Sequence, residues 1–227
     1  MKKYKIYDDC QIKELEKIYL NHFGYKEDGT FVEIGAYDGQ SFSNTCGLAD
    51  IGWTGVYVEP IKQYYNMCRS RHDHNDKVTV VNKAISSEES RITLYKGGVL
   101  STANKKAYDN FKNISWASGL FSGKTEEVQA ITMERLLKEA DIKPSFDLLV
   151  IDVEGYEWNV LKNFNIGSWK PKMVIIELHD KNPNYECLRE ECMNIVQYFD
   201  QNKYTSIYKD NTNTVYVLNE AVDANSF

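Results

Sequence analysis

Residues 146–152 read Phe-Asp-Leu-Leu-Val-Ile-Asp, a short aliphatic run that ends at a carboxylate. A run of this length, with apolar residues at consecutive positions, predicts a strand that is buried on both faces of a sheet. Comparable runs occupy residues 31–35, 55–59, 78–81 and 173–178. Helix-period segments separate the runs, and this alternation predicts an α/β fold with a mainly parallel sheet and helices on both faces.

The other segments extend this pattern toward both ends of the chain. Helical spacing of apolar residues predicts helices over residues 11–23, 41–50, 61–71 and 133–140, and two more that carry Trp158, Leu161, Phe164 and Leu188, Cys192, Ile195, Phe199. Thr132 is the expected cap of the helix over 133–140. Further strands are expected at 91–95 and 127–131, and a terminal hairpin at 204–208 and 214–218.

Residues 97–124 mix glycine, serine, lysine and aromatic side chains without a clear period. A long irregular segment inside a domain is typically functional, so we expect a lid that covers a bound substrate. No repeat or low-complexity linker interrupts the chain. We therefore expect one domain over residues 1–227, with an N-terminal helical segment over 1–30.

The composition of the chain argues against several classes of protein. The 227 residues carry a formal net charge of −6, which disfavours a general nucleic-acid binder. No signal peptide or apolar membrane span is visible. The five cysteines are odd in number and form no Cys-x-x-Cys pair, which argues against a zinc site or a disulfide framework and favours the cytoplasm.

Acids and glycines stand where the first two strands end. Ligands of such sheets bind outside the carboxyl ends of the strands, so these residues are site candidates. Glu33, Gly35, Asp38 and Gly39 follow one another in Glu-Ile-Gly-Ala-Tyr-Asp-Gly, and the Gly-x-Gly-x-x-Gly dinucleotide fingerprint is absent. Glu59 ends the second strand, where a carboxylate can accept both hydroxyls of a ribose.

These motifs resemble one family. The sequence is similar to class I S-adenosylmethionine (SAM)-dependent methyltransferases, and among them to the FkbM family, from about residue 31 to residue 180. The resemblance rests on Phe-Val-Glu-Ile-Gly-Ala-Tyr-Asp-Gly (31–39), Val-Tyr-Val-Glu-Pro (56–60), Asn-Lys-Ala-Ile-Ser (82–86), Leu-Val-Ile-Asp-Val-Glu-Gly-Tyr-Glu (149–157) and Ile-Ile-Glu-Leu-His (175–179). Met133-Glu134 departs from the Leu-Asp that the family usually has. The resemblance implies a Rossmann-like, seven-stranded sheet with a terminal antiparallel hairpin.

The resemblance also implies a cofactor and its binding residues. Glu33, Gly35, Asp38 and Gly39 are expected at the methionine end of SAM, Glu59 and Pro60 at the ribose, Ala84 and Ile85 at the adenine, with Asp152 as a further contact. Family members usually methylate hydroxyl groups on sugars or natural products. A small-molecule or glycan acceptor is therefore expected, and neither its identity nor the oligomeric state follows from the sequence.

A hydroxyl acceptor needs a base to take its proton. Asp152, Glu154 and His179 follow the fourth and fifth strands and are the candidates. Together with Glu177 they also suggest a divalent metal site, but acids at strand ends are explained without one, so we expect no metal. His22, His72 and His74 lack a motif context, and we interpret them as surface residues.

Three other readings stay open. A methyltransferase could act on a protein or another nitrogen acceptor; Asn182-Pro-Asn-Tyr185 resembles the Asn-Pro-Pro-Tyr signature of amino-group DNA methylases, but it lacks the second proline and follows the fifth strand. A nicotinamide-dependent oxidoreductase is disfavoured because the phosphate-binding fingerprint is absent. A non-catalytic SAM-binding module is disfavoured by the candidate bases and the candidate lid.

Overall fold

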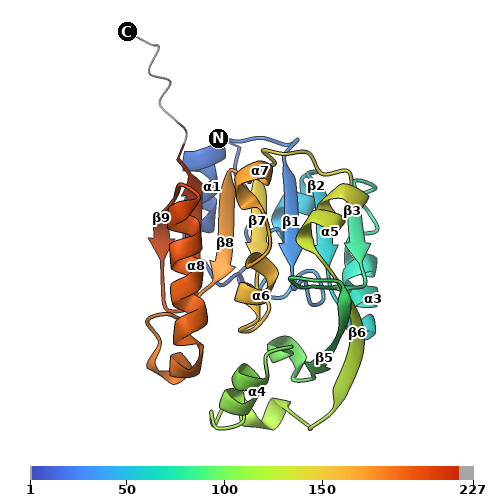
Figure 1. The fold of residues 1–227 in the computed structure, drawn as a ribbon. Helices are drawn as coiled ribbons and strands as arrows, with labels where there is room; N and C mark the ends of the chain where they lie inside the picture. Colours follow the sequence, from blue (N-terminus) through green and yellow to red (C-terminus); the bar gives the residue numbers. More distant parts are fainter. Residues whose placement is uncertain (1, 220–227) are drawn as a thin grey trace.

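The computed structural model describes residues 2–219, so the last part of the expected domain, 220–227, and Met1 lie outside the described residues. A seven-stranded sheet forms the centre of the fold (Figure 1). Its strands, in spatial order, are β3 (Val78–Val81), β2 (Thr54–Val58), β1 (Thr30–Ile34), β7 (Leu148–Ile151), β8 (Met173–Glu177), β10 (Asn213–Leu218) and β9 (Tyr204–Lys209). β10 is antiparallel to both of its neighbours, and the other pairs are parallel. The expected Rossmann-like sheet with a terminal antiparallel hairpin is confirmed.

Alternate residues of the central strands belong to two separate hydrophobic cores, one on each face of the sheet. In β7, Leu149 and Ile151 join one cluster of buried residues, whereas Leu148 and Val150 join another. The first core packs against α5 (Met133–Glu139), α6 (Glu157–Leu161), α7 (Ile166–Trp169) and α8 (Arg189–Gln201); the second packs against α1 (Leu15–Phe23), α2 (Cys46–Asp50) and α3 (Lys62–Arg71). Helices therefore cover both faces of the sheet, because its strands are apolar on both faces.

A second, three-stranded sheet stands beside the first. It consists of β4 (Ala84–Ile85), β6 (Thr125–Ile131) and β5 (Ser90–Tyr95), in that order. β4 follows β3 after two residues, so the small sheet begins at the carboxyl-end edge of the large one. This position matters for the site, because the side chains of the small sheet can close a crevice at that edge.

The segment 97–124 is more regular than its composition suggests. It contains α4 (Lys105–Phe111) between two 3₁₀ turns, η1 (Gly98–Leu100) and η2 (Ser118–Leu120). Asn104 caps α4 by accepting hydrogen bonds from the backbone N–H groups of Lys106 and Ala107. Ala107 and Phe111 bury one side of this helix, which at seven residues is too short for a periodic pattern to reveal.

Helix boundaries also differ from the expectation, and Phe164 and Leu188, which were expected in helices, lie outside α6 and α8. The helix expected over 11–23 begins only at Leu15, and the one expected over 41–50 begins only at Cys46. Before α2, Asp38 accepts hydrogen bonds from the backbone of Gln40 and Ser41, and this side chain–backbone turn replaces the first helical turns. The Thr132 cap is confirmed, since its hydroxyl accepts from the Arg135 N–H at 3.2 Å.

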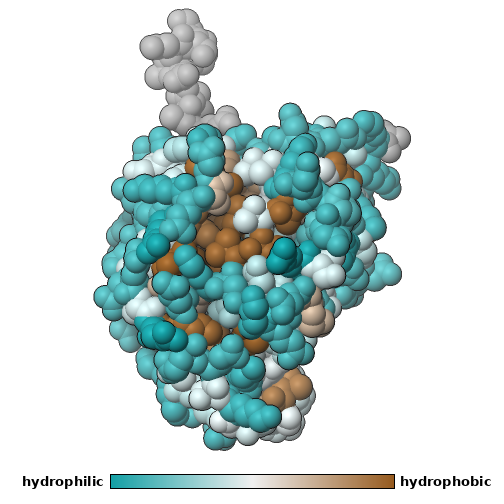
Figure 2. Space-filling view, turned by 90° about the vertical axis from the view of Figure 1, so that its right-hand side faces the viewer, coloured by the Kyte–Doolittle hydropathy of each residue, from teal (hydrophilic) through white to brown (hydrophobic). Residues whose placement is uncertain are grey.

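Residues 2–219 include no helix that is both long and apolar enough to cross a bilayer. Figure 2 shows one face of the molecule, where hydrophilic residues dominate and apolar residues gather in recessed places between them.

Before α8, the 3₁₀ turn η3 (Pro183–Leu188) follows β8 and packs against α4. The segment 97–124 is thus joined to the main fold after the carboxyl end of β8.

Candidate active site

Two adjoining cavities open where β1, β2, β7 and β8 end. The first is lined by Ile34, Gly35, Tyr37, Val58, Glu59, Pro60, Ile61, Tyr64, Ala84, Ile85, Ile92, Leu94, Gly98, Val99, Ser101, Ala103, Asp152, Val153, Glu154 and Tyr156. The second is lined by Gln11, Glu33, Gly35, Tyr37, Ser41, Phe42, Ser43, Asn44, Val99, Leu100, Ile114, Trp116, Asp152, Glu154, Glu177, His179, Asn182, Asn184, Tyr185 and Thr212. Five residues line both cavities, and two of them are Asp152 and Glu154. These two carboxylates therefore mark the boundary between the cavities.

Gly35 lets the ends of β1 and β7 come into close contact. Its φ is +91°, a conformation that side chains disfavour. A Cβ at this position would lie 1.7 Å from the carbonyl oxygen of Asp152, so no side chain fits. Gly35 thus allows the backbone of β7 to approach that of β1, and it also lines both cavities.

Glu59 is a buried carboxylate in the wall of the first cavity. Its Oε1 accepts a hydrogen bond from the Ile61 N–H at 2.7 Å, and its Oε2 accepts from the Tyr37 N–H at 3.0 Å. Burial raises the pKa of Glu59 to about 8 despite these two donors. Each carboxylate oxygen keeps a lone pair beyond its single backbone bond, so Glu59 can accept from a ligand hydroxyl.

The rest of the first cavity is a largely apolar slot. Ala84 and Ile85, both predicted, form one part of it as β4. Ile92 and Leu94 of β5 close the slot, and sequence reasoning missed them because no motif marks β5. Tyr64 was missed as well, and its ring centroid lies 4.3 Å from that of Tyr37. Such a slot between apolar and aromatic side chains suits a flat heterocycle.

Glu33 faces the second cavity and is held by hydroxyl groups. Ser43 donates to its Oε2 at 3.1 Å, and Thr45 donates to the same oxygen. Burial raises the pKa of Glu33 to about 7, although both hydroxyl groups favour the ionised form. The predicted position at the same sheet edge as Glu59 is therefore correct, but the two acids line different cavities.

Asp38 and Gly39, also predicted to bind the cofactor, are not among the described residues that line either cavity. The carboxylate of Asp38 is occupied by Gln40 and Ser41 in the turn before α2. The Gly39 carbonyl accepts from Nε2 of His72 at 2.8 Å, and a Cβ on Gly39 would meet the His72 ring at 2.9 Å. Both residues shape the loop that carries Tyr37.

This contact corrects the interpretation of His72 as a surface residue. His72 is only 2% exposed and stacks on the ring of Tyr57, with centroids 4.4 Å apart. Burial lowers the pKa of His72 to about 4, so its ring is neutral near pH 7. The residues next to His72 in the sequence are polar, so the sequence does not indicate that its side chain is buried. The burial comes from Tyr57 of β2 and from the loop that contains Gly39.

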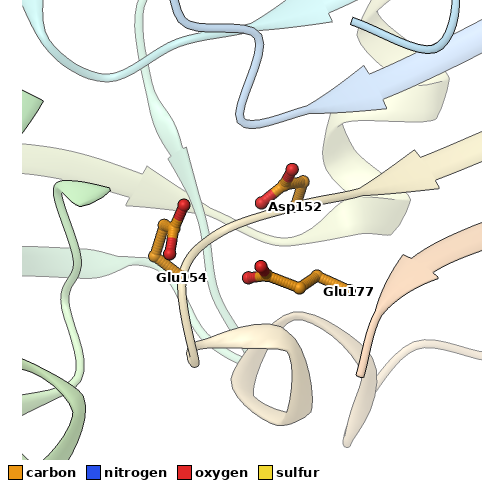
Figure 3. Close-up of side chains that lie close together, drawn as sticks. All are labelled: Asp152, Glu154 and Glu177. Atoms are coloured by element: carbon orange, nitrogen blue, oxygen red, sulfur yellow. The ribbon is translucent and has the colours of Figure 1, made fainter. Parts of the chain in front are cut away.

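Asp152, Glu154 and Glu177 form an acidic cluster at the ends of β7 and β8. One carboxylate oxygen from each lies within 4.8 Å of the other two. Figure 3 shows the three side chains pointing toward a common space. Burial, followed by the negative charge of Glu177, raises the pKa of Asp152 and of Glu154 well above the usual range. Glu154 has a φ of +57°, an uncommon conformation for a residue other than glycine.

His179 lies behind this cluster. Its Nε2 is 3.1 Å from Oε1 of Glu177, and its Nδ1 is 3.4 Å from the carbonyl oxygen of Asn211. The ring stacks on Tyr185 at 3.7 Å between centroids. Burial lowers the pKa of His179, but the charge and hydrogen bond of Glu177 outweigh burial and raise it above the ordinary value. The structure thus brings all three predicted bases to one place, with both nitrogens of His179 engaged.

The sequence profile described as "Methyltransferase FkbM domain" matches residues 33–206, which is more than half of the chain. The chain belongs to this FkbM methyltransferase family. Its cofactor is S-adenosylmethionine. No curated protein sequence matches the chain.

Solved structures similar to this FkbM domain include methyltransferases. An O-methyltransferase from Bacillus cereus in complex with SAH is 14% identical with a TM-score of 0.49, covering 95% of this chain and 83% of that one. Precorrin-6y C5,15-methyltransferase from Geobacter metallireducens GS-15 is 10% identical with a TM-score of 0.48, covering 95% and 93%. Monomeric WbdD is 13% identical with a TM-score of 0.49, covering 92% and 41%.

The first cavity of the FkbM domain has the chemistry that SAM requires. Glu59 offers a buried acceptor for the ribose hydroxyls, and the slot around Ile85 and Leu94 suits the adenine ring. Gly35 and Asp152 line both this cavity and the second. The acceptor and apolar groups present therefore fit the chemistry of the cofactor.

Proposed function

We propose that the chain methylates a hydroxyl group of a sugar, a glycan or a small natural product. One observation carries this proposal: Asp152 and Glu154 line both the cavity that suits SAM and the cavity beside it. A carboxylate thus lies at the boundary across which a methyl group has to pass. An alcohol is a poor nucleophile until a base accepts its proton. A carboxylate at this boundary is placed to be that base.

SAM, when bound, would supply an activated methyl group for the acceptor oxygen, with its sulfonium sulfur as the leaving group that keeps the electron pair. The protein contributes position and a proton acceptor. Glu59 fixes the ribose end, and Gly35 keeps the path between the cavities free of a side chain. In its ionised form, Asp152 or Glu154 takes the hydroxyl proton.

His179 supports this pair in our proposal. Both of its ring nitrogens already have partners, Glu177 and the Asn211 carbonyl, and its side chain is only 7% exposed. A base needs a free lone pair that faces the acceptor. We therefore assign His179 as a positioning residue for Glu177, and Asp152 and Glu154 as the candidate bases.

The second cavity suits a polar acceptor with hydroxyl groups. Its volume of about 350 Å³ is in the range of small-molecule sites. Asn44, Asn182 and Asn184 line it together with Trp116, whose side chain is 63% exposed. Amide groups can hydrogen-bond to several hydroxyls, and an aromatic face can stack on a sugar ring. The segment 97–124 lines this cavity through Leu100, Ile114 and Trp116, as expected of a substrate lid.

A screen of methyl acceptors tests the proposal. SAH formation is measured with neutral sugars, glycans and small alcohols, and with amine analogues of the alcohols that respond. We expect turnover with a hydroxyl acceptor and little with its amine. Turnover only with amine or protein acceptors contradicts the proposal.

Variants of the two carboxylates then test the mechanism. Asp152→Asn or Glu154→Gln should lower kcat by about 10²–10⁴-fold while SAH still binds, since that is the usual contribution of a general base. Asp180→Asn is a matched control, because Asp180 pairs with Lys209 and lines neither of the two cavities. If neither base variant loses activity, the proton acceptor lies elsewhere.

A further inference from the structure

Glu177 has one carboxylate oxygen that the protein leaves unpaired. Its side chain is 5% exposed, and Oε1 faces Nε2 of His179. Oε2 is fully buried and has no hydrogen-bond partner among the described residues. A buried polar atom without a partner costs about 1–3 kcal/mol, and more when it is charged, so such an atom calls for an explanation.

Glu16, Asp180 and Glu191 also have one buried carboxylate oxygen without a partner, but Asp180 and Glu191 each form an ion pair with a lysine. The buried acids near the site are paired in another way. Glu33, Glu59 and Glu157 each accept hydrogen bonds from two donors of the protein: Ser43 and Thr45, Tyr37 and Ile61, Val153 and Gly155 respectively. By contrast, no lysine or arginine within residues 2–219 forms an ion pair with Asp152, Glu154 or Glu177. Three carboxylates that face one another without a cation either repel one another or hold protons, which is why the pKa values of Asp152 and Glu154 are raised.

We propose that Asp152, Glu154 and Glu177 bind one divalent cation of the Mg²⁺ or Mn²⁺ class, which reverses the expectation of a metal-free site. Carboxylate oxygens are the ligands that these hard cations prefer. Ligand oxygens on one such ion lie roughly 3–4 Å apart at bond lengths of about 2.1 Å. The oxygens of the cluster, within 4.8 Å of one another, need only small side-chain movements to reach this spacing.

Two neighbouring features support the assignment. The unpaired Oε2 of Glu177 is available to the cation because His179 occupies Oε1, and a ligand carboxylate fixed by a second side chain is typical of metal sites. The left-handed backbone of Glu154, with φ at +57°, belongs to the turn after β7 that directs this carboxylate toward the other two. Strained backbone of this kind persists where a site needs it.

The cation deepens the function proposed above and, in this role, rests on it. Three protein oxygens leave several positions of a six-coordinate ion for water and for acceptor oxygens from the second cavity, which the cluster lines. A hydroxyl bound to the cation is more acidic and is held in place. Each carboxylate gives one oxygen to the ion and retains another, so the hydroxyl proton can still pass to Asp152 or Glu154.

Manganese binding tests the site without any acceptor. The full chain is freed of metal with a chelator and titrated with Mn²⁺, and free Mn²⁺ is followed by electron paramagnetic resonance. We expect one Mn²⁺ per chain and at least tenfold weaker binding in Glu177→Gln and Asp152→Asn. Asp180→Asn, which removes a charge three residues from Glu177, should bind Mn²⁺ like the wild type. Thermal unfolding verifies that each variant is folded.

Wild-type binding no tighter than that of Glu177→Gln, or an equal loss in Asp180→Asn, overturns the cation site. SAH binding is measured separately in chelator. If SAH binds without Mn²⁺ but Mn²⁺ does not bind, the cation site fails and the methyltransferase proposal stands. If SAH fails to bind to the wild type, the proposed function fails, and the Mn²⁺ titration still decides the cation site.

Discussion

The carbonyl oxygen of Asp152 occupies the place where a side chain on Gly35 would begin, 1.7 Å from a Cβ built there. Neighbouring parallel strands are therefore joined at their ends by a contact that only glycine allows. Gly35→Ala combines a positive φ with this overlap, and it should destabilise the fold by at least about 2 kcal/mol. Gly123→Ala is the control, because Gly123 also has a positive φ but nothing lies within 4 Å of its Cβ position. Chemical denaturation measures both, and an equal loss in the two variants contradicts the overlap argument.

The affinity for SAH should depend on pH through Glu59. Burial holds the pKa of this acid at about 8 in the free protein, whereas the ribose hydroxyls bind best to the ionised carboxylate. Binding must therefore release a proton below pH 8, and the dissociation constant should fall up to tenfold per pH unit between pH 6 and about 8. Calorimetry in two buffers of different ionisation enthalpy measures the proton release. Glu59→Gln should weaken binding and abolish the pH dependence; an unchanged slope in this variant is the contrary result.

The stability of the ligand-free protein should fall as the pH rises. The pKa values of Glu33 and Glu59 are raised to about 7 and about 8, above the ordinary value of 4.5. Between these values the folded state keeps protons that the unfolded chain has lost, so the free energy of unfolding decreases from about pH 5 to pH 8. Glu33→Gln and Glu59→Gln should each flatten this slope, whatever their effect at a single pH. Urea denaturation at each pH measures it, and a flat profile in the wild type contradicts the prediction.

The side-chain amide of Asn104 forms hydrogen bonds both within the candidate lid, residues 97–124, and to the turn after β7. Its oxygen caps α4, and its Nδ2 donates to the Gly155 carbonyl at 2.6 Å. Asn104→Asp keeps the cap and loses the donor, so hydrogen exchange in residues 97–124 should speed up while exchange in the large sheet stays the same. Bound SAH should slow exchange around Val99, which lines both cavities. Exchange in 97–124 as slow as in the sheet, in wild type and variant alike, rules out a mobile lid.

The sequence was sufficient to predict those site residues that directly end a strand. Glu59 and Asp152 are of this kind, because a buried parallel strand can be read from its apolar run and its carboxyl end has a fixed place. Asp38 shows where such reading stops: it belongs to the same motif, but its carboxylate is used by the backbone of the next turn. Motif membership does not reveal which way a side chain turns.

Residues that reach the site from distant elements were harder to predict. Ile92 and Leu94 belong to the small sheet, whose position beside the large one follows from pairings between β4, β5 and β6 that no local pattern announces. His72 is buried by Tyr57, a partner in another strand. The unpaired oxygen of Glu177 also cannot be predicted from the sequence. It depends on which hydrogen-bond donors the folded chain places next to this carboxylate.

The place of β10 between β8 and β9 affects the order in which the protein can be made. During synthesis β8 emerges well before residues 213–218, so its outer edge has no strand to pair with until almost the whole described chain has left the ribosome. The turn before β10 also contacts the chain just after β8, next to the acidic cluster. The carbonyl oxygen of Thr212 accepts a hydrogen bond from the Leu178 N–H, and the carbonyl oxygen of Asn211 lies next to Nδ1 of His179. The edge that carries the acidic cluster is thus completed last, and an interrupted nascent chain presents an open, apolar strand to its surroundings.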